Sequence, residues 1–230
     1  MSEPTKLYKL TNKDGTSYGG RQWGPGITHE TDGRGEVCGP GFMHWYTHPL
    51  LAVLLNPIHA DFKNPVLWEG EGEIAKEDHG LKVGCTKGTT IKQIPLPTVT
   101  IEQRVRFGIL CALEVCKDKS FVQWANDWLS GKDRTVATAW AGASGAWVAA
   151  IAAWVAAREA WVAAEATSAA TRAAEAALAS KAAAKAAAWA ACISRAAEAA
   201  MAVAEVVNVA TKTDKPINLI VLAKKAVEEQ

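Results

Sequence analysis

The sequence has no excess of charge of either sign. Its 25 Lys and Arg side chains are balanced by 24 Asp and Glu side chains, which leaves a net charge of +1. Proteins that bind duplex nucleic acid through its phosphates carry a basic surface, so we expect no duplex partner. The N-terminal segment also lacks the basic stretch and apolar core of a signal peptide. We therefore expect no membrane partner either.

Standard disulfide, metal and catalytic signatures are missing as well. The five cysteines are an odd number without the spacing of a disulfide framework, which is typical of a reduced, cytosolic protein. No CxxC, HExxH, GxSxG or P-loop pattern occurs. We assign no catalytic residue, metal or cofactor. Two weaker alternatives stay open: a zinc site and a Cys38 nucleophile with His44 or His48 as its base. The zinc alternative would draw on Cys38, His44, His48, His59 and Cys85.

Composition changes abruptly near residue 134, where alanine begins to dominate. We expect an N-terminal domain over residues 1–133, an Ala/Trp-rich helical region over 134–210 and a closing helix within 211–230. The predicted fold class is α+β, with a small mixed sheet followed by long helices. Because alanine buries little area, these helices need partners, either in a hairpin or in an oligomeric bundle.

The N-terminal region predicts strands over residues 6–12, 65–74 and 81–94, with short strands and tight turns between 17 and 42. Predicted helices begin at Thr47 or His48, at Thr100 and at Ser120, and Asn56–Pro57 should end the first of them. A further pattern alternates Glu69, Glu71 and Glu73 with glycine. On a strand these carboxylates share one face, and we expect a solvated sheet edge.

The Ala-rich region contains a stripe of tryptophans. Trp140, Trp147, Trp154 and Trp161 are seven residues apart, and Trp189 returns to the same face further along. A straight helix rotates this spacing by only about 20° per heptad, so the indoles form one row. We interpret the row as a packing surface in a homo-oligomer or against a partner. A ladder that stacks ligands is the alternative.

A second aromatic group is mixed with basic residues in a Gly/Pro-rich stretch. Arginine offers a permanent charge to phosphate, and aromatic rings offer stacking faces, so this pattern favours a planar anionic ligand such as a nucleotide. The same residues could instead form a Trp/His-rich core. The predicted ligand-binding residues are Arg21, Trp23, His44, Tyr46 and His48.

Residues 35–73 and 79–97 carry a resemblance to a known group of proteins. The shared features are Cys-Gly-x-Gly-Phe with a nearby His, then Pro-Leu with an apolar helix, a strand ending in Gly-Glu and a Lys-containing strand. Over residues 6–130 the chain resembles an uncharacterised domain of bacteriophage and prophage proteins, which carry Ala-rich or other low-complexity repeats of variable length behind it. The resemblance implies a phage accessory protein in the cytoplasm of the bacterial host, and it brings no catalytic residues.

Three functions follow from these observations. We favour a counter-defence protein that binds and sequesters a nucleotide immune signal, such as a cyclic nucleotide, without catalysis. The second is a protein–protein inhibitor that covers a host defence protein with its Ala/Trp helices. The third is a nucleotide-modifying enzyme that uses His44 or His48.

Overall fold

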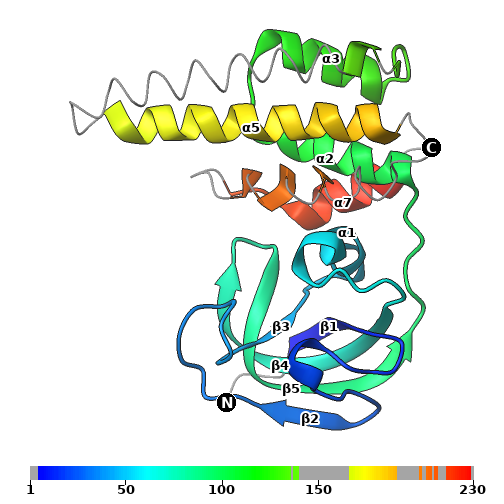
Figure 1. The fold of residues 1–230 in the computed structure, drawn as a ribbon, viewed down its shortest axis with the longest axis vertical. Helices are drawn as coiled ribbons and strands as arrows, with labels where there is room; N and C mark the ends of the chain where they lie inside the picture. The colour runs from blue at the N-terminus through cyan, green and yellow to red at the C-terminus, as the bar shows by residue number, and fades with distance from the viewer. Residues whose placement is uncertain are drawn as a thin grey trace. The chain divides into compact units, whose positions relative to one another are not determined.

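The computed structural model describes residues 5–135, 137–139, 166–190, 202–203, 206–208, 210–211 and 216–228. These fall into two compact units (Figure 1). The first unit comprises Met1–Val99 with Asn218–Ala223, and the second comprises Thr100–Ile217 with Lys224–Gln230. These units are defined by which residues contact one another in the fold. The boundary expected at residue 134 rests instead on the change in alanine content along the sequence. An N-terminal sheet followed by helices confirms the predicted α+β class.

The first unit contains one five-stranded sheet. Its order is β1-β4-β5-β2, and β3 also pairs with β5. Every pairing among the described strands is antiparallel, where a mixed sheet was expected. The strands are β1 (Thr5–Thr11), β2 (Ile27–Glu30), β3 (Met43–Trp45), β4 (Val66–Asp78) and β5 (Lys82–Ile94).

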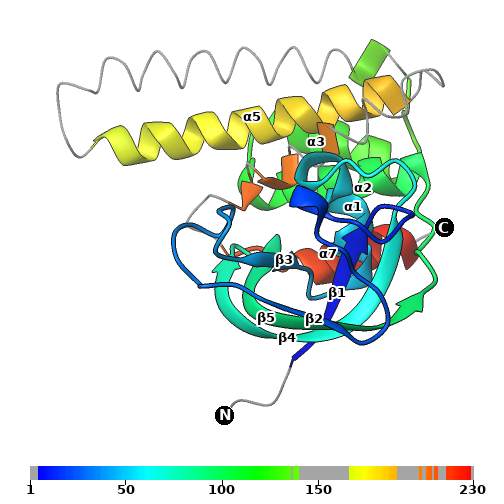
Figure 2. The same cartoon turned by 60° about the horizontal axis from the view of Figure 1, so that its bottom comes forward.

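Four of these strands close into a ring. β1 pairs with β4, β4 with β5 and β5 with β3. Tyr46, directly after β3, then exchanges two backbone hydrogen bonds with Tyr8 of β1, at 2.8 and 2.9 Å. Figure 2 shows the strong curvature of β4 and β5 that this closure requires. A core cluster of this unit consists of Leu7, Trp23, Met43, Trp45, Val83 and Cys85.

Glycines on the long strands make room for Trp45. A Cβ atom at Gly88 would lie 2.7 Å from the Trp45 ring, and one at Gly70 would lie 2.9 Å from it. The alternation with glutamate around Gly70 therefore sets buried glycines on one side of β4 and carboxylates on the other. The expected sheet edge is wrong, because β4 lies between β1 and β5. On the outer side, Glu69 forms ion pairs with Lys6 (2.7 Å) and Lys92 (3.3 Å).

Helix α1 (Pro49–His59) begins as predicted, with His48 as its N-cap. It does not end at Asn56–Pro57, and that expectation is wrong. Pro57 lies inside the helix, which continues to His59. The end is held by Asn56, whose carbonyl accepts from the backbone N–H groups of Ala60 and Asp61. The side-chain amide of Asn56 also exchanges two hydrogen bonds with the backbone of Phe62, so the chain is fixed beyond the proline.

The second unit is helical. It contains α2 (Ile101–Val115), α3 (Lys119–Leu129), α5 (Ala166–Ala190) and the second half of α7 (Leu219–Glu228). Helix α5 runs alongside α2 (Figures 1 and 2), and its small Ala side chains permit this close approach. A Cβ atom at Gly108 of α2 would lie 3.3 Å from Val203, which shows how tightly this part is packed. Within the described residues, no helix is long and apolar enough to cross a membrane.

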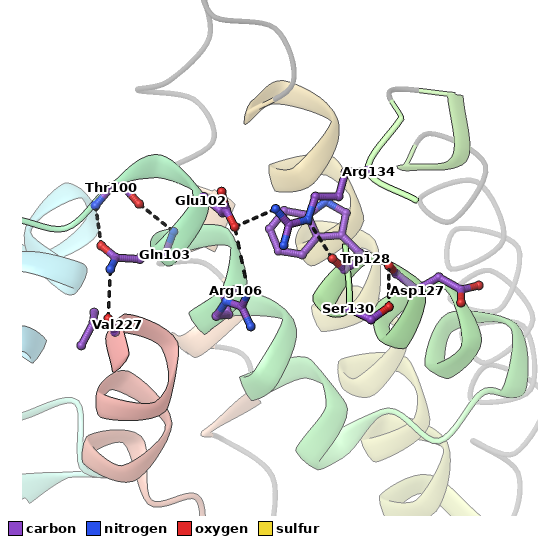
Figure 3. A network of polar contacts seen from close by, with 9 residues as sticks. All are labelled: Thr100, Glu102, Gln103, Arg106, Asp127, Trp128, Ser130, Arg134 and Val227. Atoms are coloured by element: carbon purple, nitrogen blue, oxygen red, sulfur yellow. Dashed lines mark hydrogen bonds and ion pairs between the residues drawn. The ribbon is translucent and has the colours of Figure 1, made fainter. Parts of the chain in front are cut away.

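Polar contacts fix the ends of α2, α3 and α7 (Figure 3). Thr100 and Gln103 form a capping box at the start of α2, and Gln103 also donates to the carbonyl of Val227 at 3.1 Å. Arg134 binds Glu102 at 2.7 Å and donates to the carbonyl of Trp128, while its guanidinium lies over the Trp128 ring.

The predicted tryptophan stripe lies outside the described part of the chain. This holds for Trp140, Trp147, Trp154 and Trp161 and for the side chain of Trp189.

Candidate ligand-binding site

A buried lysine lies at the centre of the first unit. Lys9 lies two residues after Leu7 on β1 and is 6% exposed. Its ammonium group donates to the carbonyl of His44 at 2.9 Å and lies 4.7 Å from the Trp23 ring centroid and 5.4 Å from that of Trp45. Two indole faces and one carbonyl therefore replace the water that a lysine normally keeps.

The surroundings of Lys9 are unusual because they supply positive charge and no carboxylate. Burial lowers the pKa of Lys9 to about 7, and the nearby charge of Arg21 lowers it further. Neither side chain forms a salt bridge within the described part of the chain. Trp45 adds a buried indole N–H that has no hydrogen-bond partner among the described residues. Among the described residues around Lys9, hydrogen-bond donors and positive charges thus outnumber hydrogen-bond acceptors.

Arg21 lies on a hairpin that connects β1 to Trp23. Asp14 accepts hydrogen bonds from the backbone and hydroxyl of Thr16, and these bonds lower the pKa of its carboxyl. The backbone N–H of Ser17 donates to the carbonyl of Arg21 at 2.9 Å. The indole of Trp23 donates to the hydroxyl of Ser17 at 2.8 Å, so the hairpin is tied to the core.

The five predicted ligand residues do not line one open pocket. Trp23 is 2% exposed and lies edge-on to Trp45, and Tyr46 is also buried. His48 accepts from the backbone N–H of Leu50 as the cap of α1. The side chain of Arg21 is half-buried, and its charge adds to the effect of burial that lowers the pKa of Lys9. The Lys9 ammonium group brings together two of the five predicted residues, because it contacts the Trp23 ring and the backbone carbonyl of His44.

Tyr46 and His44 belong to a neighbouring polar cluster. The Tyr46 ring stacks on His59, and its hydroxyl lies 3.2 Å from His59 Nδ1. Burial raises the pKa of Tyr46 and lowers that of His59 to about 4, so both are neutral near pH 7. Burial also lowers the pKa of His44, whose Nε2 lies 2.5 Å from the carbonyl of Val37. Next to this cluster, the ammonium group of Lys82 lies 3.4 Å from a carboxylate oxygen of Asp78, so these two charges pair with each other.

The described residues give no support to the zinc alternative, and they place Cys38 of the nucleophile alternative at the surface. Cys38 is exposed and Cys85 is buried, and burial raises the pKa of Cys85 to about 12. No group of three or more metal-binding side chains occurs within the described residues. A surface pocket of about 360 Å³ is lined by residues 65–67 and 93–96, none of which was predicted as a site residue.

Sequence reasoning missed two residues here. Lys9 gave no signal, because lysine on a strand is normally solvated. Tyr18 lies at the tip of the hairpin in a short 3-10 turn, Tyr18–Gly20, and is 98% exposed. An aromatic residue followed by two glycines in a turn was the available signal for Tyr18.

Comparison with known proteins adds one finding. A family model described as a domain of unknown function (DUF7666) matches residues 5–102. The match covers all five strands of the first unit and the beginning of α2. Neither the curated proteins nor the solved structures contain a significant match to the chain.

Proposed function

We propose that the protein is a non-enzymatic binding protein whose ligand is an anionic molecule of the nucleotide class. The observation that carries this proposal is that the Lys9 ammonium group is buried against one carbonyl and two indole rings, while neither Lys9 nor Arg21 forms an ion pair among the described residues. Burial, and with it the charge of Arg21, lowers the pKa of Lys9 to about 7, and a bound anion would favour the charged form of Lys9 again. Arginine is also the side chain best suited to hold a phosphate through two parallel hydrogen bonds.

Each of the two candidate histidines has one ring nitrogen engaged in the fold: His44 Nε2 lies 2.5 Å from the carbonyl of Val37, and His48 Nδ1 accepts from the backbone N–H of Leu50. We propose binding rather than catalysis because the sequence carries no standard catalytic motif. The resemblance to phage proteins gives the binding a biological setting: sequestration of a nucleotide immune signal in the host cytoplasm. The homo-oligomer and the inhibitor surface on the Trp stripe remain predictions outside the described residues.

Calorimetric titration with cyclic di- and trinucleotides and cyclic ADP-ribose isomers tests the proposal. We expect one of these to bind, and to be recovered intact after the protein is denatured by heat. Arg21→Ala should weaken binding at least tenfold, about 1.4 kcal/mol, with little change in melting temperature. Arg34→Ala, which removes an exposed arginine from another loop, is the matched control and should bind normally.

Two results would count against the proposal. Recovery of a chemically altered nucleotide would indicate an enzyme. Absence of binding across the panel at micromolar protein would favour the protein–protein inhibitor instead.

A further inference from the structure

Tyr18 is exposed to an extent that the fold does not explain. Its side chain is 98% exposed, the highest value among the large hydrophobic residues described. Within the described residues it makes no hydrogen bond, ion pair or ring contact. Removing an aromatic ring from water is favourable, so aromatic side chains are enriched where a partner covers them. The Tyr18 ring is therefore better placed to bind another molecule than to pack in the core.

The tip that carries Tyr18 is held in one conformation. On one side, the backbone N–H of Ser17 donates to the carbonyl of Arg21, and that of Gly20 donates to the carbonyl of Ser17. On the other side, the Ser17 hydroxyl accepts from the buried indole of Trp23. An exposed ring on a preorganised turn loses less conformational entropy on binding than one on a mobile loop.

The surface between Tyr18 and Arg21 is bare backbone. Gly19 and Gly20 have φ angles of 73° and 74°, which favour glycine. A Cβ atom at either position would meet no atom within 4 Å, so open space surrounds both residues. A flat molecule can therefore approach the turn closely without meeting a side chain.

We propose that Tyr18 is the stacking platform for the planar group of the ligand, while Arg21 holds its anionic group. This inference rests on the proposed function and names the ligand class more narrowly, as one with both an aromatic face and a phosphate. Tyr18 and Arg21 are three residues apart on one rigid turn, so the two contacts are presented together. Aromatic stacking on a base is sequence-tolerant, because every base has a π face. Tyr18 sets the requirement for a planar group, and Arg21 sets the requirement for charge.

The test compares two probes on the full-length protein. The first is the tightest-binding cyclic nucleotide of the panel, and the second is inorganic pyrophosphate, which has charge but no planar group. Tyr18→Ala should weaken the nucleotide roughly tenfold and leave pyrophosphate unchanged. Tyr18→Phe keeps the ring and should bind both probes like the wild type. Arg21→Ala should weaken both.

The outcomes separate this inference from the proposed function. If the wild type binds no nucleotide, the proposed function fails first. If the wild type binds but Tyr18→Ala binds equally well, the stacking role is wrong while the anion site stands. Equal weakening of nucleotide and pyrophosphate by Tyr18→Ala would also overturn the inference, because it would indicate a general disturbance of the turn. The exposure of Tyr18 makes loss of folding an unsuitable explanation, and a melting curve of each variant checks this.

Discussion

The buried Lys9 ammonium should make the stability of the first unit depend on pH. Its ordinary pKa is 10.5, and burial with the charge of Arg21 lowers the folded-state pKa to about 7. Between these values the unfolded chain binds a proton that the folded chain does not. The free energy of unfolding must therefore rise as pH rises from about 7 to 10.5, with a slope of roughly 1.4 kcal/mol per pH unit.

Opposing effects decide how large the change is. Two indole faces and the His44 carbonyl favour the charged form of Lys9, and each cation–π contact contributes about 0.5–2 kcal/mol. Removing an ammonium group from water costs several kcal/mol in real proteins, so burial dominates. Over the full interval the change amounts to about 5 kcal/mol. Between pH 7 and 9 it is about 2–3 kcal/mol, which is readily measured.

Urea unfolding at several pH values between 7 and 9 provides the assay. Lys9→Met keeps most of the length of the side chain and removes the titrating group, so the difference between wild type and variant isolates Lys9. The variant should lose the slope. Lys82→Met is the matched control, since Lys82 is also buried but lies 3.4 Å from Asp78, and it should retain the wild-type slope. The same slope in Lys9→Met as in the wild type would refute the reasoning.

Two further substitutions test the packing and the caps. Gly88→Ala places a methyl group 2.7 Å from the buried Trp45 ring, and we expect a loss of about 1–3 kcal/mol in urea unfolding, with no loss indicating that the ring has another position. Thr100→Ala removes the hydroxyl that accepts from Gln103 at the start of α2, and it should cost about 1 kcal/mol, whereas Thr100→Ser should be near neutral by the same measurement.

Local chemistry explains which features the sequence could predict. Thr100 and His48 are caps, and the rules for caps depend on a few adjacent residues. The strand predictions rest likewise on β-branched runs and turn residues. Pro57 misled the prediction because its effect on α1 was judged from the dipeptide alone. The side chain of Asn56 bonds to Phe62 beyond the helix, and that contact is visible only in the fold.

Closure of the sheet could not be predicted from these rules. It depends on the pairing of Tyr8 with Tyr46, residues that are far apart in the chain. The closure decides which side of β1 becomes interior, and so it decides that Lys9 is buried. The ring chemistry of Trp23 predicts a ligand-binding residue, and in the structure that ring lies against the Lys9 ammonium group, a contact that the sequence does not predict.

The alternation of glutamate and glycine predicts the two faces of β4 correctly but its position in the sheet wrongly. Period-two geometry correctly sets Glu69, Glu71 and Glu73 apart from the intervening glycines. An edge strand is the expected place for such charges, but β4 is a central strand. On its inner side, a Cβ atom at Gly70 would lie 2.2 Å from the carbonyl oxygen of Thr89 and 2.9 Å from the Trp45 ring, so only glycine fits there. On its outer side, Glu69 forms ion pairs with lysines of both neighbouring strands. Carboxylates at alternate positions therefore do not require an edge strand, because the strands on either side of a central strand can supply the opposite charge.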